Sequence, residues 1–329
     1  QRIDTRGRGA WREYAGFVSR VLRGTGRDVA LFVGHDMHGL LPARLLATRY
    51  RRPLVYHCHD FTDSSRILPW GSRIVQKFEQ RFARTADLVI VPDARRGEVV
   101  EKELRLKRAP LIVANAPLNR PLKDGNALHE AVGSQGREFE RIVLRQGRIA
   151  EGHAIEATLR SIPQWASRNW GFVLLGVQDA AFVEHVRTLV NTLGVEQQFA
   201  MLPAVAYDRV LDYTPGADVG HALYDPVHIN NVHITTASNK IMEYLAAGLP
   251  LLVSDTPSQR ALVEAHRCGV TADERSPDSI AATVNSLLGQ PERSREFGAA
   301  ARRAFEQVFC YERQFAPALE GLRALAAGL

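Results

Sequence analysis

The sequence predicts an α/β protein of two domains, each built on a parallel β-sheet flanked by helices. The chain has 329 residues, which is long for one hydrophobic core and comfortable for two. Short β-branched runs alternate with helical stretches of about 10 to 15 residues, the order expected of repeated βαβ units. A stretch rich in glycine, asparagine and charge at 118–138 interrupts this alternation, which then starts again.

The first half holds four candidate strands and the second half six, enough for one doubly wound sheet. Those of the first half are Asp28–Val33, Pro53–His57, Asp87–Val91 and Pro110–Ala114. Those of the second are Arg141–Arg145, Phe172–Leu175, Gln198–Leu202, Asp218–Ala222, Pro250–Ser254 and Gly269–Thr271. Two longer helices, Pro291–Val308 and Tyr311–Ala327, close the chain. We therefore predict domains at 1–120 and 139–308, a linker at 121–138, and a C-terminal helix at 309–329 that packs back on the first domain.

The composition is that of an ordinary soluble globular protein. Hydrophobic residues make up 45% and charged residues 24%. No apolar run approaches the roughly 18 residues that a membrane-spanning helix needs, and no secretion signal follows Gln1. The three cysteines are widely separated and form no metal-like or redox-like pair. We expect reduced thiols and a cytoplasmic protein; the cysteines are Cys58, Cys268 and Cys310.

Charge is distributed unevenly along the chain. Residues 1–120 hold 23 Lys and Arg against 12 Asp and Glu, whereas the rest hold 19 against 24. A basic domain indicates an anionic partner. We predict that this partner is an anionic substrate or the inner face of a membrane, and not a nucleic acid. Solvated basic helix faces are the alternative. The leading stretch is the most basic, with Arg2, Arg6, Arg8, Arg12, Arg20, Arg23 and Arg27.

The segment 236–255 carries the strongest candidate site, because ligands of open α/β sheets bind beyond the carboxyl ends of strands. Ser238 is a good N-cap for a helix over Asn239–Ala247, and Gly248 supplies a left-handed stop. A helix N-terminus offers free N–H groups and partial positive charge to a diphosphate. Glu243, one turn along, could accept hydrogen bonds from ribose hydroxyls. The alternative is an ordinary crossover helix with an exposed glutamate.

The run S-N-K-I-M-E-Y-L-A-A-G-L-P at 238–250 resembles the donor-site signature of glycosyltransferase family 4, in the branch that reads S-x-P-N-K-x-x-E-Y-x-A-A-G-x-P. The resemblance extends over about 28–329 and is most specific in the C-terminal half. It implies a GT-B fold, in which two Rossmann-like domains face a cleft and the C-terminal helices cross back to the first. Further similar motifs, in the family's order, are Q-G-R-I at 146–149, V-L-L-G at 173–176, L-D-Y-T-P-G-A-D at 211–218 and Y-E-R-Q at 311–314.

The resemblance implies transfer of a sugar from a nucleoside-diphosphate sugar to a hydroxyl acceptor, with retention of anomeric configuration and without metal or cofactor. The acceptor would be a glycan, a lipid-linked sugar or a small molecule. By the same resemblance Glu243 binds the ribose, while Arg148 neutralises the leaving phosphate with a fixed guanidinium fork. Arg148 as a plain surface arginine is the alternative. The other implied donor contacts are Gly147, His153, Ser238, Asn239 and Lys240.

Two positions depart from the family pattern. Thr235 stands where the family commonly has a glutamate that touches the donor sugar. His153 stands where it has Lys or Arg, so either this imidazole is protonated against the diphosphate or a charge is missing. Because of these departures a second interpretation stays open, in which the chain is a degenerate GT-B protein that binds a nucleotide or glycan without catalysis. A sugar epimerase or phosphorylase of the same architecture fits the signature less well.

Candidate acceptor-side residues follow two strands of the first half. His59, in Y-H-C-H-D, fits a histidine that family members direct at the reaction centre, and Asp60 could orient its ring. His35 and Asp36 could line the acceptor cleft, although Asp36 could equally cap a helix. Two histidines flanking a cysteine also suggest a metal, but no further ligand cluster lies nearby in the sequence, so we predict no metal site.

The stretch 224–231 is predicted as a loop over the donor, with Asn230 and Asn231 as possible hydroxyl contacts. The spacing of the neighbouring His221, His228 and His233 fits no compact metal motif. Family members normally open with a strand, a glycine-rich loop and a helix. Nothing before Asp28 matches this pattern, so we expect either a fragment or a reduced first domain.

Overall fold

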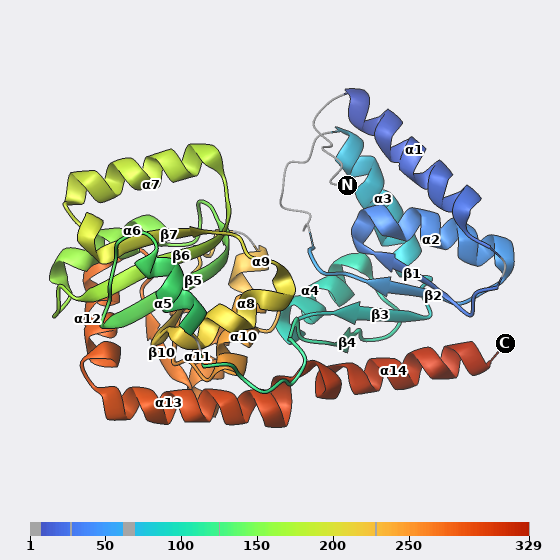
Figure 1. Ribbon diagram of the computed structural model, residues 1–329. Helices are drawn as coiled ribbons and strands as arrows, with labels where there is room; N and C mark the ends of the chain where they lie inside the picture. Colours follow the sequence, from blue (N-terminus) through green and yellow to red (C-terminus); the bar gives the residue numbers. More distant parts are fainter. Residues whose placement is uncertain (1–7, 27, 62–69, 125, 228, 329) are drawn as a thin grey trace. The chain divides into compact units, whose positions relative to one another are not determined.

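The computed structural model describes residues 8–26, 28–61, 70–124, 126–227 and 229–328 (Figure 1). The chain divides into two compact units. The first contains Gln1–Ala114 together with Gln314–Leu329, and the second contains Asn115–Arg313. The chain therefore passes from one unit to the other twice. Among the described residues, no helix combines the length and apolarity that crossing a membrane requires.

The first unit is built on a four-stranded parallel sheet of order β1-β2-β3-β4. Consecutive strands are neighbours, so right-handed crossovers place the connecting helices on one face. The strands are β1 (Phe32–His35), β2 (Leu54–His57), β3 (Leu88–Val91) and β4 (Leu111–Ile112). The helices are α1 (Arg8–Gly24), α2 (Asp36–Tyr50), α3 (Trp70–Ala83), α4 (Ala94–Leu104) and the C-terminal α14 (Tyr311–Ala327).

The two faces of this sheet pack against different parts of the chain. Side chains alternate between faces along a strand, and Leu54 and Tyr56 accordingly belong to the larger core together with α2 and α4. Val55, Ile90 and Val113 point the other way and pack with Ala318 of α14. The predicted return of the C-terminal helix to the first domain is confirmed.

The second unit is a six-stranded parallel sheet of order β10-β9-β8-β5-β6-β7. The chain runs outward from β5 to β7 and then restarts at β8 on the other side, so a topological switch point lies between β5 and β8. The strands are β5 (Arg141–Ile149), β6 (Trp170–Gln178), β7 (Phe199–Pro203), β8 (Val219–Ala222), β9 (Leu251–Ser254) and β10 (Gly269–Ala272). The six strands predicted in this half are confirmed.

Helices cover both faces of the second sheet, as a doubly wound topology requires. They are α5 (Asn126–Gly133), α6 (Ile155–Ser161), α7 (Ala180–Leu193), α8 (Val210–Tyr213), α9 (Ile229–Val232), α10 (Asn239–Ala247), α11 (Pro257–His266), α12 (Pro277–Leu288) and α13 (Pro291–Ala304). Short 3-10 turns lie at Ile162–Gln164, Glu196–Gln198, Tyr207–Arg209 and Thr214–Gly216, and a π-helical turn, Phe305–Phe309, follows α13. Helix α5 occupies part of the range predicted as a linker, and Leu128 and Val132 anchor it by complete burial.

Strands β5 and β6 are longer than predicted, and their extra residues shape the site. They remain paired from Arg141 and Trp170 as far as Ile149 and Gln178, whereas β8 pairs with β5 only at Val143 and Leu144. The extension requires glycine at two positions. A Cβ at Gly176 would lie 1.7 Å from the carbonyl oxygen of Gly147, and Gly147 itself has a φ of +93°, which other residues rarely adopt. The last residues of β5 therefore project beyond β8 at the switch point.

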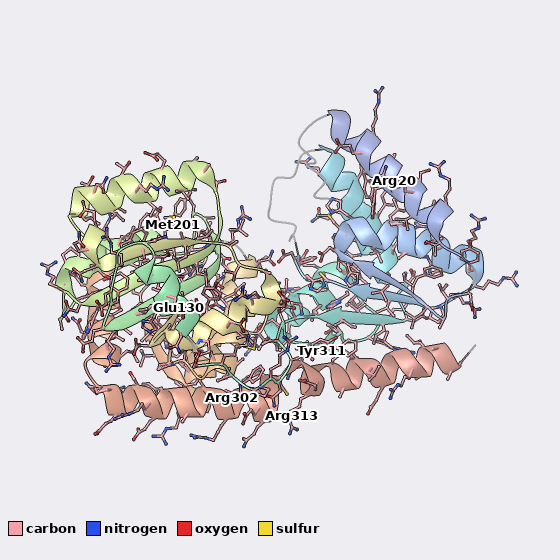
Figure 2. The ribbon with its side chains drawn as sticks, in the orientation of Figure 1. Arg20, Glu130, Met201, Arg302, Tyr311 and Arg313 are labelled. Atoms are coloured by element: carbon pink, nitrogen blue, oxygen red, sulfur yellow. The ribbon has the colours of Figure 1, made fainter. Side chains whose placement is uncertain are left out.

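Arg302 of α13 fixes the far end of α10 (Figure 2). Its guanidinium donates to the carbonyl oxygen of Ala246, one of the carbonyls that the helix end leaves unpaired. It also donates to Glu306 at 2.7 Å and to Asn119 at 3.0 Å. Helix α10 is thus held at its C-terminus, and its N-terminus lies at the site described next.

Candidate donor site

Helix α10 begins and ends where its sequence predicts. The Ser238 side chain caps the N-terminus by accepting a hydrogen bond from the Ile241 N–H at 3.3 Å. Gly248 ends the helix in the left-handed conformation, with φ of +70°. The Ser238 hydroxyl also contacts the hydroxyl of Tyr224 at 2.7 Å. The predicted helix Asn239–Ala247 is confirmed, and its cap is tied to the segment that follows β8.

The end of β5 and helix α10 meet through side chains, although almost a hundred residues separate them. Gln146 Nε2 donates to Glu243 Oε2 at 2.6 Å, and Gln146 Oε1 accepts from the Thr214 hydroxyl at 2.9 Å. The Lys240 side chain lies against Gly147, where a Cβ would be 3.6 Å from its Cε. The structure therefore brings two of the predicted donor segments, 147–148 and 238–243, to one place at the switch point.

Glu243 is held inside the unit, not on the exposed face that the alternative interpretation assumed. It is 6% exposed. Burial raises the pKa of its carboxyl, while the Gln146 hydrogen bond and the Lys240 charge act in the opposite direction. A buried carboxylate with one hydrogen bond from an amide keeps acceptor capacity for further hydroxyl donors.

Arg145 is a fully buried cation beneath this site, and nothing in the sequence analysis pointed to it. Its Nη1 donates to the Leu223 carbonyl at 3.0 Å. Its Nε and its second terminal nitrogen are buried with no hydrogen-bond partner among the described residues. No carboxylate forms an ion pair with it in the described part of the chain. Burial lowers the pKa of Arg145.

Tyr224 lies between two cations. The Arg145 guanidinium carbon is 5.3 Å from its ring centroid, and the Lys240 ammonium is 5.0 Å from it. Lys240 Nζ also donates to the Tyr224 hydroxyl at 2.9 Å. Burial alone would raise the pKa of Tyr224, but Lys240 and Arg145 together lower it below its usual value. Burial likewise lowers the pKa of Lys240. Cations therefore gather at the end of β5, where Glu243 is a nearby carboxylate.

His153 is buried beside three cations. Burial strongly lowers the pKa of its imidazole, and the nearby charges of Arg145, Lys240 and Arg148 lower it further. Its ring packs edge-on against Tyr224, with centroids 5.6 Å apart. These shifts describe the site without a diphosphate, whose negative charge would raise the pKa of the imidazole. The pH dependence of nucleotide affinity near neutral pH separates the two possibilities that the sequence left open: affinity falls as the pH rises if the bound imidazole is protonated, and it stays constant if the charge is missing.

The remaining predicted donor contacts differ in exposure. Gly147, Arg148 and Asn239 are exposed at the strand and helix ends. The Thr235 hydroxyl is buried without a hydrogen-bond partner among the described residues. Asn230 and Asn231 lie in helix α9, so the predicted loop contains a helical turn, and Asn231 donates to the Asp225 carbonyl at 2.9 Å.

Of the three histidines near this stretch, His221 belongs to the core of the second unit. His221 lies inside β8, fully buried, where its ring nitrogens contact Arg145 at 3.1 Å and the Thr158 hydroxyl at 2.8 Å. His228 is outside the described residues. The role of His221 is to pack the core beneath the site.

Three residues of this site escaped sequence reasoning: Arg145, Gln146 and Tyr224. One signal for them was present in the sequence. An arginine and a glutamine interrupt the apolar run of a central parallel strand, which is normally apolar on both faces. Such residues need specific partners, and here the partners come from β8 and α10.

The predicted acceptor-side residues lie together in the first unit. The Nδ1 of His35 is 3.3 Å from the Nε2 of His59. Asp36 is the first residue of α2 and does not cap it; its carboxylate accepts from the backbone N–H groups of His59 at 2.7 Å and Asp60 at 3.2 Å. Asp60 pairs with Arg96 at 3.7 Å. The His59 ring is therefore oriented by His35, and not by Asp60 as the sequence suggested.

The structure has the features of the GT-B fold. Each of its two units is built on a parallel sheet, a polar site lies at the switch point of the second unit, and the C-terminal helix packs on the sheet of the first. Solved structures agree. Anabaena HepE in complex with UDP and glucose superposes with a TM-score of 0.74 at 16% identity, over 98% of this chain and 84% of that one. A glycosyltransferase from Rickettsia africae gives 0.73 at 10% identity, over 99% and 84%.

Sequence comparison gives the family. Residues 140–290 match the family described as glycosyl transferases group 1, and residues 2–115 match the glycosyltransferase 4-like domain. The chain belongs to the group 1, glycosyltransferase 4-like glycosyltransferases. A similar curated protein is the GDP-mannose-dependent alpha-(1-6)-phosphatidylinositol monomannoside mannosyltransferase of Mycobacterium tuberculosis, 25% identical over 164 residues. This match spans 50% of the present chain and 40% of the relative.

Proposed function

We propose that this chain transfers a sugar from a nucleoside-diphosphate sugar to a hydroxyl acceptor, with retention of configuration and without a metal ion. The observation that carries the proposal is the meeting of the end of β5 with the start of α10. Gln146 bonds Glu243 at 2.6 Å, and Lys240 packs on Gly147. A carboxylate acceptor, a capped helix N-terminus and a group of cations thus share one switch point, where ligands of such sheets bind.

Each part of this arrangement matches one part of the donor. Glu243 accepts hydrogen bonds from the ribose hydroxyls. The free N–H groups at the start of α10, near Ser238 and Asn239, meet the diphosphate. Lys240 and Arg148 supply positive charge on either side of Gly147, and the buried Arg145 adds to the local field. Among the described residues Glu243 is the nearby carboxylate for Lys240, Arg145 and Arg148. The negative charge of a diphosphate would therefore compensate these cations.

The reaction needs no covalent intermediate on the protein. The bond between the anomeric carbon and the phosphate oxygen breaks as the bond from that carbon to the acceptor oxygen forms on the same face. The acceptor proton passes to the departing phosphate. Arg148 stabilises the negative charge that grows on this phosphate, and positioning supplies much of the rest. His59, His35, Asp36 and Asp60 are the proposed acceptor-side contacts.

A second candidate is a protein that binds a nucleotide or glycan without catalysis. Thr235 and His153 favour it, because a buried hydroxyl and an imidazole stand where the family resemblance implies a sugar-binding carboxylate and a cation. In that case the same site binds the donor nucleotide but does not promote cleavage of its glycosidic bond.

Two measurements on the whole chain test these proposals. A thermal-shift screen of UDP, GDP and ADP and their sugars should identify the donor, because a ligand at about 100 times its Kd stabilises the folded state by about 2.7 kcal/mol. The stabilising sugar nucleotide should then be hydrolysed slowly without an acceptor. Stabilisation without hydrolysis, and without transfer to any tested acceptor, would support the binding protein. If no nucleotide or sugar nucleotide stabilises the chain, the transferase fails, and of the second candidate only binding of a glycan is left.

The first unit is proposed to work at an anionic surface, which also suits a lipid-linked acceptor. Arg12, Arg20 and Arg23 are exposed on α1. A groove of about 1190 Å³ between α3 and α4 has Phe78, 40% exposed, among its lining residues. Arg2, Arg6 and Arg27 lie outside the described residues. The cations that line the groove are Lys77, Arg81, Arg84, Lys102, Arg105 and Lys107.

We expect the protein to co-sediment with anionic vesicles at about 50 mM salt and to be released at about 500 mM, because the Debye length shortens about threefold. Each basic residue near the surface contributes about 1 kcal/mol. Replacing Arg12, Arg20 and Arg23 together by glutamine should reduce binding. The matched control replaces three exposed arginines of the second unit, Arg160, Arg187 and Arg295. Equal retention by neutral vesicles, or equal losses in both triple variants, would refute the proposal.

A further inference from the structure

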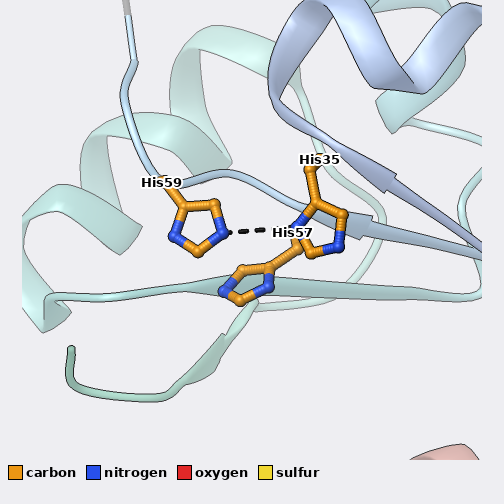
Figure 3. A group of neighbouring side chains, drawn as sticks. All are labelled: His35, His57 and His59. Atoms are coloured by element: carbon orange, nitrogen blue, oxygen red, sulfur yellow. Dashed lines mark hydrogen bonds between the residues drawn. The ribbon is translucent and has the colours of Figure 1, made fainter. Parts of the chain in front are cut away.

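Strand register gathers three histidines of the first unit (Figure 3). His35 ends β1 and His57 ends β2, and the two are direct partners in the parallel ladder. Register partners on adjacent strands direct their side chains to the same face of a sheet. His59 follows two residues later and turns its ring toward both. One nitrogen from each of the three rings lies within 4.8 Å of the others. In the sequence only His57 and His59, which flank Cys58, suggest a metal, and the pairing of β1 with β2 adds His35 to them.

The rings are held by groups outside the cluster. The Asp36 carboxylate fixes the backbone of His59 and Asp60 by accepting both N–H groups. Arg96, 1% exposed, donates to the His59 carbonyl from the other side. The segment that carries His59 is therefore anchored at both its N–H and its carbonyl. This support gives the three imidazoles a preformed arrangement, which a metal site requires for tight binding.

One nitrogen of the cluster lacks a hydrogen-bond partner. His57 Nε2 is buried, and no described residue forms a hydrogen bond with it. A buried polar atom without a partner costs free energy, and a bound ion would relieve this arrangement. Imidazole binds a metal ion through a nitrogen that carries no proton.

The atoms that can coordinate the ion determine which kind of ion binds. Cys58, between two of the histidines, points into the core, where its thiol donates to the Asp60 carbonyl at 3.9 Å, and it does not belong to the cluster. The Asp36 carboxylate is engaged with the backbone. Imidazole nitrogens alone favour Zn²⁺ and similar transition metals over Mg²⁺ and Ca²⁺, which prefer oxygen.

We propose that His35, His57 and His59 form a binding site for one divalent transition-metal ion of the zinc type. Three protein ligands leave a fourth position open to water or to another small ligand. The site belongs to the first unit and shares His35 and His59 with the proposed acceptor-side contacts. The transfer chemistry proposed above itself requires no metal. The presence of the site is accordingly tested by binding and not by activity.

The test uses the whole chain without an affinity tag, freed of metal by a chelator. Isothermal titration with Zn²⁺ in a non-coordinating buffer at pH 7.5 should give one high-affinity site per chain. Co²⁺ should occupy the same site and develop visible absorption bands of nitrogen-coordinated cobalt. Mg²⁺ should not compete. His35→Ala is the primary variant, because His35 is the exposed member of the cluster and its loss perturbs the core least.

We expect His35→Ala and His59→Ala each to weaken Zn²⁺ binding by at least about 100-fold, more than the 10- to 100-fold that the loss of an outer hydrogen-bond partner costs. His129→Ala, an exposed histidine of α5, is the matched control and should bind as the wild type does. Circular dichroism should show that the variants are folded. Zn²⁺ affinity unchanged in His35→Ala, or no stoichiometric site in the wild type, would overturn the proposal.

Discussion

Replacing Glu243 by alanine should abolish sugar transfer and lower the affinity for nucleoside diphosphate by at least about 100-fold. A hydrogen bond to a charged group contributes about 1.5 to 3 kcal/mol, and the ribose would lose two of them. The titration of wild type and variant with the nucleotide found in the thermal-shift screen measures the effect. Nearby side chains offer no substitute, because the Gln146 amide oxygen is already engaged by Thr214 at 2.9 Å.

The same substitution removes the partner of Gln146, so its effect on folding must be separated from its effect on binding. Glu243→Gln keeps the volume and an oxygen that can accept from Gln146, and it should still reduce nucleotide binding, because the amide replaces one acceptor by a donor. Glu264→Ala, an exposed glutamate of α11, is the control. Wild-type nucleotide affinity in a folded Glu243→Ala protein would sink the assignment of the donor site.

Arg148→Ala should lower kcat by about 100- to 1,000-fold, the usual cost of removing one group that stabilises transition-state charge, while donor affinity falls much less. The reason is that negative charge on the phosphate grows as the glycosidic bond breaks, so the arginine stabilises the transition state more than the bound donor. Steady-state kinetics together with nucleotide titration separate the two effects.

Because Arg148 is exposed, this substitution should leave the free energy of unfolding within about 0.5 kcal/mol of the wild type. Arg187→Ala, exposed on α7, controls for loss of one positive charge in the same unit. Arg148→Lys should recover part of the rate, since it restores the charge but not the planar fork. Equal losses in kcat and in affinity would argue that Arg148 only anchors the donor.

The elements that could be predicted are those whose signals are local. Helix α10 carries its own cap and stop in Ser238 and Gly248, and both of its ends were predicted. Strands β5 and β6 were predicted too short, because their continuation depends on a close approach of Gly147 and Gly176 from different strands. Helix α5 was hidden within a polar stretch, since its apolar contacts are few and are completed by the rest of the second unit.

In the candidate site, the residues that belong to sequence motifs could be predicted. The residues whose role depends on contacts between distant segments could not. Glu243 and Lys240 belong to a recognisable run. Arg145 can be recognised as a site residue only in the folded chain, where the segment after β8 places Tyr224 against it. The state of His153 likewise depends on three cations brought near by the fold.

The packing of α14 on the first sheet has a consequence for biosynthesis. Val55, Ile90 and Val113 leave the ribosome before the second unit is made, but Ala318, which covers them, is made after it. Synthesis of the intervening residues 115–313 takes on the order of 10 to 40 s at about 5 to 20 residues per second. During this time the second unit can fold while one apolar face of the first sheet stays open to chaperones or to misassembly. The first unit is therefore begun before the second and completed after it, and a chain released before α14 is made would retain a folded donor half beside an unfinished partner.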